Sequence, residues 1–318
     1  MNRTIKIVFT LFWIVTQVHA QRLEQAKNLY EQKKYDQVKK ILGSIEKDNT
    51  DFAAARYYLG RVAVDEKKFD DAVDYFKEAT EANGKVAEYQ VWLGDTYGAI
   101  AKDANVFKQG LLAPKMRNAW EAAIALDPKN INSRQSLVQF YLQAPGFMGG
   151  SVDKAKEVAN QLLKIKPAEG HYQAGLIFLH EKKKPEAEKE FLEMVKLDPL
   201  YTLTLANYYI EQKQYDKAFA LFEDALKKNP EDYAAIYQYG KTSALSGQKL
   251  DRGEEYLKKY LNYSPKQNEA SLPRAKMRLG QIKEKKGQKA EAKKMFEEAL
   301  KDDNSLKEAK EGLERVSK

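Results

Sequence analysis

One spacing of small and large residues recurs along the chain and constrains its fold more than any other feature. After a small residue, further small or apolar residues follow at +12, +16 and +19 and a proline at +24, as at Ala206, Ala218, Phe222, Ala225 and Pro230. The +12, +16 and +19 positions repeat after Gly60, Gly175 and Gly280, with a proline again at +24 after Gly175, and in a looser form after Ala26. A chain that repeats one helix-turn-helix spacing forms a solenoid, in which each repeat packs on its neighbours. The sequence therefore predicts an all-α array.

The segments between the expected helices carry turn and stop signals. Three turns share the order basic, polar, aromatic and Asp, at residues 33–36, 67–70 and 213–216. We expect the Asp of each turn to cap the second helix of its hairpin through its carboxylate. Prolines follow several of these second helices, where they cannot continue the helix but suit the start of the next one.

These residues resemble the tetratricopeptide repeat (TPR) family. The segments Trp92-Leu93-Gly94-x-x-Tyr97 and Tyr58-Leu59-Gly60 are similar to the family signature in the first helix of a repeat. The resemblance implies a right-handed superhelical solenoid of about eight repeats over residues 21–304, followed by a C-terminal capping helix over 305–318. The repeats are expected to start near residues 19, 53, 87, 131, 168, 199, 233 and 273.

Two repeats are longer than the others. About ten residues are inserted near 95–115, measured against the 34-residue period of the family. A second insertion at 144–150 reads Ala-Pro-Gly-Phe-Met-Gly-Gly, and the following Ser151 is expected to cap a helix. The APGFMGG loop is similar to that of a subgroup of exported bacterial TPR proteins. We expect Phe147 and Met148 to fold back against the first insertion; a surface that waits for a partner is the alternative.

Residues 1–20 have the pattern of a signal peptide. Arg3 and Lys6 precede an apolar run, and Val18-His19-Ala20 forms a small-x-small cleavage site before Gln21. The apolar run is shorter than the roughly 20 residues that span a bilayer, so an uncleaved anchor is the less favoured alternative. The sequence therefore predicts an exported protein, periplasmic in a Gram-negative bacterium and secreted otherwise, with no membrane span after cleavage.

Candidate sites for catalysis, metals and cofactors are weak. The chain has no cysteine, and His171 and His180 lack the i,i+4 spacing of a two-histidine metal site. Gly240-Lys241-Thr242 is similar to the end of a P-loop, but Ala235 stands where the first glycine is needed. Ser151 and Lys154 form a Ser-x-x-Lys pattern that a helix cap explains better. We therefore expect no enzyme, no cofactor and no metal site.

The charge of the chain does not favour nucleic acid as a partner. The sequence has 54 Lys and Arg against 46 Asp and Glu, a net charge of +8. Basic and acidic residues alternate along the helices, which is typical of a solvated surface rather than a nucleic-acid interface. Export would also separate the protein from nucleic acid.

In the TPR family the first helix of each repeat lines the concave groove. The resemblance thus implies a non-catalytic protein- or peptide-binding adaptor or scaffold of the cell envelope, which binds an extended partner segment in that groove. The inward positions combine aromatic, amide and cationic side chains. The candidate site residues among them are Tyr57, Tyr58, Arg61, Trp92, Gln135, Gln139, Tyr172, Asn207, Tyr237, Gln238, Lys241, Arg274 and Arg278; Asp95, Gln173, Thr204 and Gln281 are further inward positions. The alternative function is an exported protein that binds a glycan or small ligand by aromatic stacking.

Four of these positions suggest a more specific partner. Some TPR domains hold a chain-terminal carboxylate with an asparagine, an amide from the next repeat and two cations from the third. Asn207, Gln238, Arg274 and Arg278 occupy similar positions, although Leu203 stands where that pattern has a lysine. The resemblance therefore implies a partner with an acidic C-terminal tail.

Overall fold

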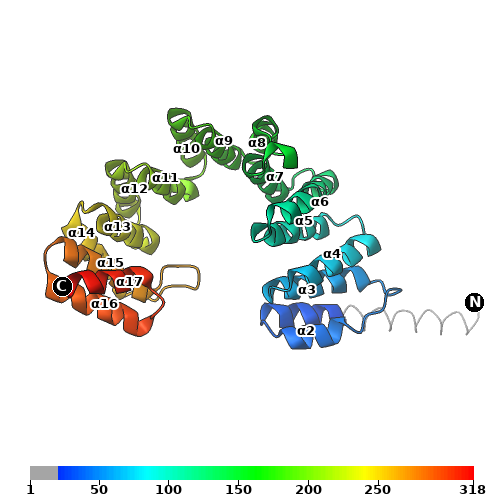
Figure 1. Cartoon of the computed structure of the whole chain (residues 1–318), viewed down its shortest axis with the longest axis horizontal. Coiled ribbons are helices and arrows are strands. Elements are labelled where there is room, and N and C mark those ends of the chain that lie inside the picture. The colour runs from blue at the N-terminus through cyan, green and yellow to red at the C-terminus, as the bar shows by residue number, and fades with distance from the viewer. Residues whose placement is uncertain (1–20) are drawn as a thin grey trace, which may run out of the picture. The chain divides into compact units, whose positions relative to one another are not determined.

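The computed structural model describes residues 21–318, which are helices joined by short turns without any strand (Figure 1). These residues fall into two compact units that divide between Met194 and Val195. The predicted all-α fold is confirmed. The predicted signal peptide over residues 1–20 lies outside the described residues.

The helices of the first unit form consecutive hairpins. Residues 21–31 are helical and precede α2. The elements that follow are α2 (Tyr35–Leu42), α3 (Phe52–Asp65), α4 (Phe69–Ala82), α5 (Ala87–Lys102), α6 (Val106–Leu126), α7 (Ile131–Gln143), the 3-10 helix η1 (Gly146–Met148), α8 (Val152–Ile165), α9 (Pro167–His180) and α10 (Lys184–Leu197), which extends past the boundary at Met194.

The second unit continues the same pattern and ends on a single helix. Its elements are η2 (Pro199–Tyr201), α11 (Thr202–Glu211), α12 (Tyr215–Lys228), α13 (Tyr233–Ser246), α14 (Leu250–Leu261), α15 (Leu272–Lys285), α16 (Lys289–Asp302) and α17 (Lys307–Val316). Over residues 21–318 the helices thus form eight hairpins followed by α17, as predicted for eight repeats with a capping helix.

The recurring sequence spacing corresponds to contact between the two helices of a hairpin. A Cβ added at Gly60 would lie 2.6 Å from the ring of Phe76, and one added at Gly280 would lie 2.8 Å from the ring of Phe296. Both phenylalanines are fully buried. The +16 spacing therefore pairs a residue without a side chain with a large ring, so that the two helices approach closely.

The turns between paired helices contain lysines in the left-handed backbone region. Lys67 has φ 61° and follows α3, where its N–H donates to the carbonyl of Val64 and that of Lys68 donates to Ala63. This is the Schellman pattern, which satisfies the last carbonyls of a helix and favours glycine at the left-handed position. Gly287 occupies the same position after α15.

Replacing Lys67 with glycine is expected to raise the free energy of unfolding by about 0.5–1 kcal/mol. Relief of the left-handed strain gains about 1–2 kcal/mol, and the greater entropy of glycine in the unfolded chain offsets part of that gain. Urea unfolding followed by circular dichroism measures the difference. Lys68→Gly is the control, because Lys68 has φ −90° and gains no such relief. A lower stability for Lys67→Gly would contradict this account.

The predicted capping by the turn aspartates is wrong in its geometry. The residues at the N-caps of α2, α4 and α12 are Lys34, Lys68 and Gln214, and none has a side-chain cap bond. Asp70, like its counterparts, lies within the first helical turn instead. There its charge interacts favourably with the helix dipole without accepting the cap hydrogen bond.

The two insertions contact each other in the first unit. The first one lengthens α6 to 21 residues, compared with 14 in α4, and Asn105 caps its start. The second forms η1, and a Cβ added at Gly110 of α6 would lie 3.8 Å from the methyl group of Met148. Ser151 accepts a hydrogen bond from the N–H of Lys154, so its predicted capping role is confirmed.

Candidate functional site

A pocket of about 530 Å³ in the second unit contains most of the residues predicted there. It lies between α13, α15 and the start of α17, and residues 268–270 form one edge. The predicted residues that line it are Tyr237, Gln238, Lys241, Arg274 and Arg278. Asn207, on α11, is exposed and is not among the lining residues. The structure thus brings five of the six predicted residues of this unit to one pocket.

Arg278 is engaged by a carboxylate of the protein itself. Its guanidinium is bidentate with Glu308 of α17, with Nη2 3.0 Å from Oε1 and Nη1 bonded to Oε2. Gln281 also donates to Glu308, at 3.1 Å. Burial would raise the pKa of Glu308, but the bonds from Arg278 and Gln281 outweigh it and lower that pKa. Arg278 therefore forms the floor of the pocket instead of the ligand contact expected from the sequence.

Two other cations of the pocket have no such partner. Within residues 21–318, the side chains of Lys241 and Arg274 make neither a hydrogen bond nor an ion pair. Burial, followed by the positive charges of Arg278 and Arg274, lowers the pKa of Lys241, although Glu308 opposes this. The Oε1 atom of Gln238 is buried without a hydrogen bond partner. This arrangement can accept an anionic group through charge-assisted hydrogen bonds.

The charges around this pocket leave it positive. Its ionisable lining residues are Lys241, Arg274, Arg278, Lys307, Glu269 and Glu308. Cations therefore outnumber carboxylates, and one of the carboxylates is already bound to Arg278. Tyr237 forms part of the wall, because it is 8% exposed and its ring packs 5.2 Å from that of Tyr260.

The aromatic side chains predicted for the groove of the first unit pack on one another. The guanidinium of Arg61 lies 4.4 Å from the ring centroid of Tyr30 and 5.2 Å from that of Trp92. Tyr57 is 5% exposed, packs 5.1 Å from Tyr58 and donates to Glu88. Tyr57 is thus a core residue, and the expectation that it lines the groove is wrong. Arg61 and the neighbouring rings use these aromatic faces internally, which disfavours a stacking platform for a glycan.

Three further predicted residues of the first unit, Gln135, Gln139 and Tyr172, do not share one site. Gln139 lines a second cavity, of about 700 Å³, together with Asp95, whereas Gln135 is not among its lining residues. The ring of Tyr172 packs 6.2 Å from that of Phe191.

The tip of the second insertion points in two directions. Met148 is half-buried and lines the cavity of about 700 Å³, so it folds back as expected. Phe147 is 81% exposed and does not fold back, so the expectation for this residue is wrong. Phe107 of the first insertion is also exposed, at 76%. Phe147 and Met148 are consecutive in η1, and a 3-10 helix turns once per three residues, so the two side chains cannot both face the core.

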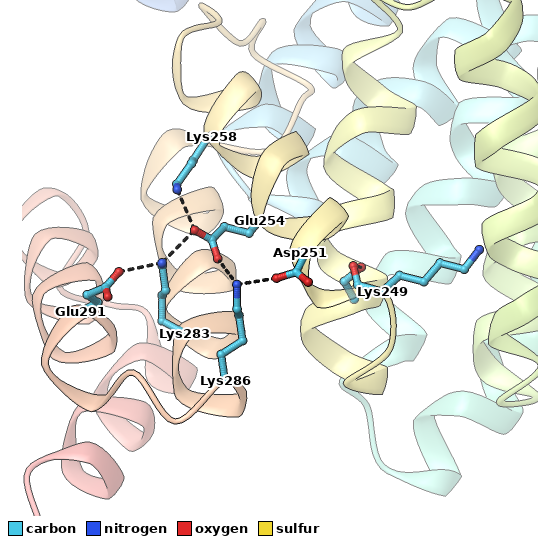
Figure 2. Close-up of polar contacts among 8 residues, drawn as sticks. Lys249, Asp251, Glu254, Lys258, Lys283, Lys286 and Glu291 are labelled. Carbon is cyan, nitrogen blue, oxygen red and sulfur yellow. Dashed lines mark hydrogen bonds and ion pairs between the residues drawn. The ribbon is translucent and has the colours of Figure 1, made fainter.

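An ion-pair network in the second unit connects α14 to α15 (Figure 2). Glu254 of α14 is 7% exposed, and its carboxylate contacts the ammonium groups of Lys258 at 2.6 Å, Lys283 at 2.8 Å and Lys286 at 2.9 Å. Lys286 also contacts Asp251 at 2.6 Å. The lysines of this cluster are neutralised by the protein's own carboxylates. The contacts of Lys283 and Lys286 with Glu254 join α15 to α14. None of these lysines lines the pocket that contains Lys241 and Arg274, so they do not add to its positive charge.

The described residues offer no assembled metal centre. No group of three or more His, Asp or Glu side chains in residues 21–318 could hold a metal ion. His171 pairs with Glu190, whose Oε2 is 2.7 Å from Nδ1. Over the same residues, every helix is too short or too polar to cross a bilayer.

Sequence models of the tetratricopeptide repeat match residues 23–97, 199–242 and 273–305. The peroxisomal targeting signal receptor of Saccharomyces cerevisiae is 27% identical over 151 residues, which are 45% of this chain and 24% of the receptor. The chain therefore spans about a quarter of the length of that relative.

Two solved structures are similar to this chain. A tetratricopeptide repeat protein from Parabacteroides merdae superposes with a TM-score of 0.50 at 13% identity, covering 95% of this chain and 100% of that one. YrrB, a TPR protein with an unusual peptide-binding site, has a TM-score of 0.44 at 16% identity, covering 59% of this chain and 90% of that one. The likeness to the P. merdae protein shows the fold. The chain is thus an all-α array of helical hairpins that carries tetratricopeptide repeats.

Proposed function

We propose that this protein is a non-catalytic adaptor or scaffold whose second unit binds a carboxylate-bearing segment of a partner protein. Tetratricopeptide repeats support a protein-binding role. The observation that carries the finer proposal is that Lys241 and Arg274 face one pocket and have no carboxylate partner within residues 21–318. A peptide that ends in acidic residues would supply the missing negative charge.

Each part of the pocket has a separate task in this proposal. A carboxylate of the partner bonds to Lys241 and Arg274, and the buried Oε1 of Gln238 accepts a hydrogen bond from the partner's backbone N–H. The Arg278–Glu308 pair holds α15 against α17, so the pocket is formed before the partner arrives. A preformed site loses less conformational entropy on binding than one that must order itself.

The proposal places this function in the cell envelope. It rests on the signal-peptide pattern of residues 1–20, where Arg3 and Lys6 precede an apolar run and a cleavage site before Gln21. The protein would then meet its partner in the periplasm of a Gram-negative bacterium, or outside the cell otherwise.

The double variant Lys241→Ala/Arg274→Ala is expected to bind an acidic-tailed peptide about tenfold or more weakly than the wild type, because two charge-assisted contacts are lost. The probe is a fluorescein-labelled peptide that ends in Asp-Asp with a free carboxylate, and its fluorescence anisotropy measures the affinity. The same peptide with a C-terminal Lys-Lys is expected not to bind.

The control is Lys227→Ala/Lys228→Ala, which removes the same charge from exposed positions at the end of α12. This control is expected to bind like the wild type at 150 mM salt, since long-range charge effects are then largely screened. Equal affinity of the pocket variant and the wild type for the Asp-Asp peptide would refute the site.

A further inference from the structure

The first unit contains a separate cavity of about 700 Å³ that the two insertions help to build. It lies between α5, α6, α7 and the turn that includes η1. Gln109 and Ala113 belong to the lengthened α6, and Pro145 and Met148 belong to the second insertion. A volume of this size lies within the range of ligand pockets, about 300–1,000 Å³.

Aromatic and methionine side chains form an apolar part of the cavity wall, beside the polar side chains of Asp95, Lys102, Gln109, Ser136, Gln139 and Gln143. The rings of Trp120 and Phe140 are 4% and 7% exposed and lie 6.3 Å apart in an edge-to-face arrangement. Met116 and Met148 are half-buried lining residues, and methionine adapts its shape to an irregular apolar ligand. A Cβ added at Gly98 of α5 would make only ordinary contacts, 3.7 Å or more from these groups. An aliphatic chain can therefore pack here.

One carboxylate faces this apolar surface without a cation. Oδ1 of Asp95 accepts hydrogen bonds from the indole N–H of Trp120 at 2.8 Å and from the hydroxyl of Ser136 at 3.3 Å. Both donors are neutral, and Oδ2 has no hydrogen bond within residues 21–318. Desolvation of the carboxylate by the surrounding side chains raises the pKa of Asp95 above its ordinary value, although the two hydrogen bonds oppose this. Asp95 is nevertheless exposed, so a ligand can reach it.

We propose that this cavity binds an organic cation, with its ammonium or guanidinium group on Oδ2 of Asp95 and its aliphatic stem against Met116 and Met148. A positive group would restore the electrostatic balance that neutral donors cannot provide. The same chemistry is present in a lysine or arginine side chain of a partner protein and in a free polyamine. This site lies in the other unit from the acidic-tail pocket and does not depend on it.

Lys102 also lines the cavity but does not neutralise Asp95. It lies seven residues further along α5, which corresponds to about 10 Å along the helix axis. Its ammonium group makes no ion pair with Asp95, whose hydrogen-bond partners within residues 21–318 are Trp120 and Ser136. The charged head of the ligand is therefore drawn to the Asp95 end of the cavity.

The test uses two cationic probes and one neutral probe on the full chain. The cationic probes are spermidine and a nonapeptide with blocked ends and one central lysine; the neutral probe has norleucine in place of that lysine. Binding is measured by calorimetry and by the ¹⁵N–¹H shift of the Trp120 indole, which bonds directly to Asp95. We expect the lysine peptide, spermidine or both to bind and shift this signal, and the norleucine peptide not to bind. The cation that binds identifies the source; binding of neither overturns the proposal.

Matched variants separate the charge from the shape of the cavity. Asp95→Asn keeps the size and the acceptor for Trp120, and is expected to weaken cation binding about tenfold or more. Gly98→Leu places a bulky side chain next to Met116 and Trp120, where the aliphatic stem of the ligand would lie, and is expected to weaken cation binding as well. Asp36→Asn is the control, because its side chain is 97% exposed on α2 and it removes the same charge. Equal binding by Asp95→Asn and Asp36→Asn overturns the proposal. Binding that persists in Lys241→Ala/Arg274→Ala shows that the two sites are distinct.

Discussion

Replacing Phe296 with alanine is expected to lower the free energy of unfolding of the second unit by about 3–5 kcal/mol. The ring is fully buried. It lies so close to two neighbouring helices that a Cβ at Gly280 or at Gly312 would come within 2.8 Å or 2.4 Å of it. Alanine would leave a cavity between α15, α16 and α17 that glycines cannot fill, because they have no side chains to move into it.

Urea unfolding followed by far-ultraviolet circular dichroism measures this loss. The control is Phe147→Ala, which removes a ring that is 81% exposed and is expected to change the stability by less than about 0.5 kcal/mol. If Phe296→Ala were as stable as this control, the helix contacts that underlie the +16 spacing would not hold the second unit together.

Replacing Glu254 with glutamine is expected to cost about 3 kcal/mol near neutral pH. Burial would raise the pKa of Glu254, but hydrogen bonds from Lys258, Lys283 and Lys286 outweigh it and lower that pKa from 4.5 to about 2. Lys283 is itself only 7% exposed, so the loss of this carboxylate leaves a buried ammonium with Glu291 as its remaining partner. Glutamine keeps the shape of the side chain and removes its charge.

The same network makes stability depend on pH in a defined window. The folded-state pKa of Glu254 is depressed, so its stabilising contribution is present above the unfolded value of 4.5. That contribution is lost as the pH falls from 4.5 towards about 2. The difference in unfolding free energy between wild type and Glu254→Gln should therefore shrink over this range.

Glu297→Gln is the control for both measurements. Glu297 is 4.0 Å from Lys293, and both side chains are about half exposed, so this pair contributes little. If the difference in unfolding free energy between wild type and Glu254→Gln stayed constant from pH 7 to pH 3, the lysines would not lower the pKa of Glu254 as described.

The helices were predictable because their signals are local. Gly280 and Phe296 belong to one hairpin, and their separation of only sixteen positions leaves little freedom in how the two helices meet. The same holds for Ser151, whose cap bond goes to Lys154 three residues later. The left-handed lysines of the turns were not predicted. Glycine usually occupies such positions, and a lysine such as Lys67 gives no sign of a left-handed backbone in the sequence.

The all-α repeat architecture, and the helices that carry Lys241, Arg274 and Arg278, follow from the sequence alone. Which of these three cations is free to bind a partner's carboxylate depends on the packing of the helices. Arg278 is bound by Glu308, which lies 30 residues away on the capping helix, whereas Lys241 and Arg274 have no such partner within residues 21–318. Likewise, Asp95 meets Trp120 across 25 residues. Periodicity specifies which face of a helix is buried, but a charge pairs with whatever group the packing of other helices brings within a few ångströms.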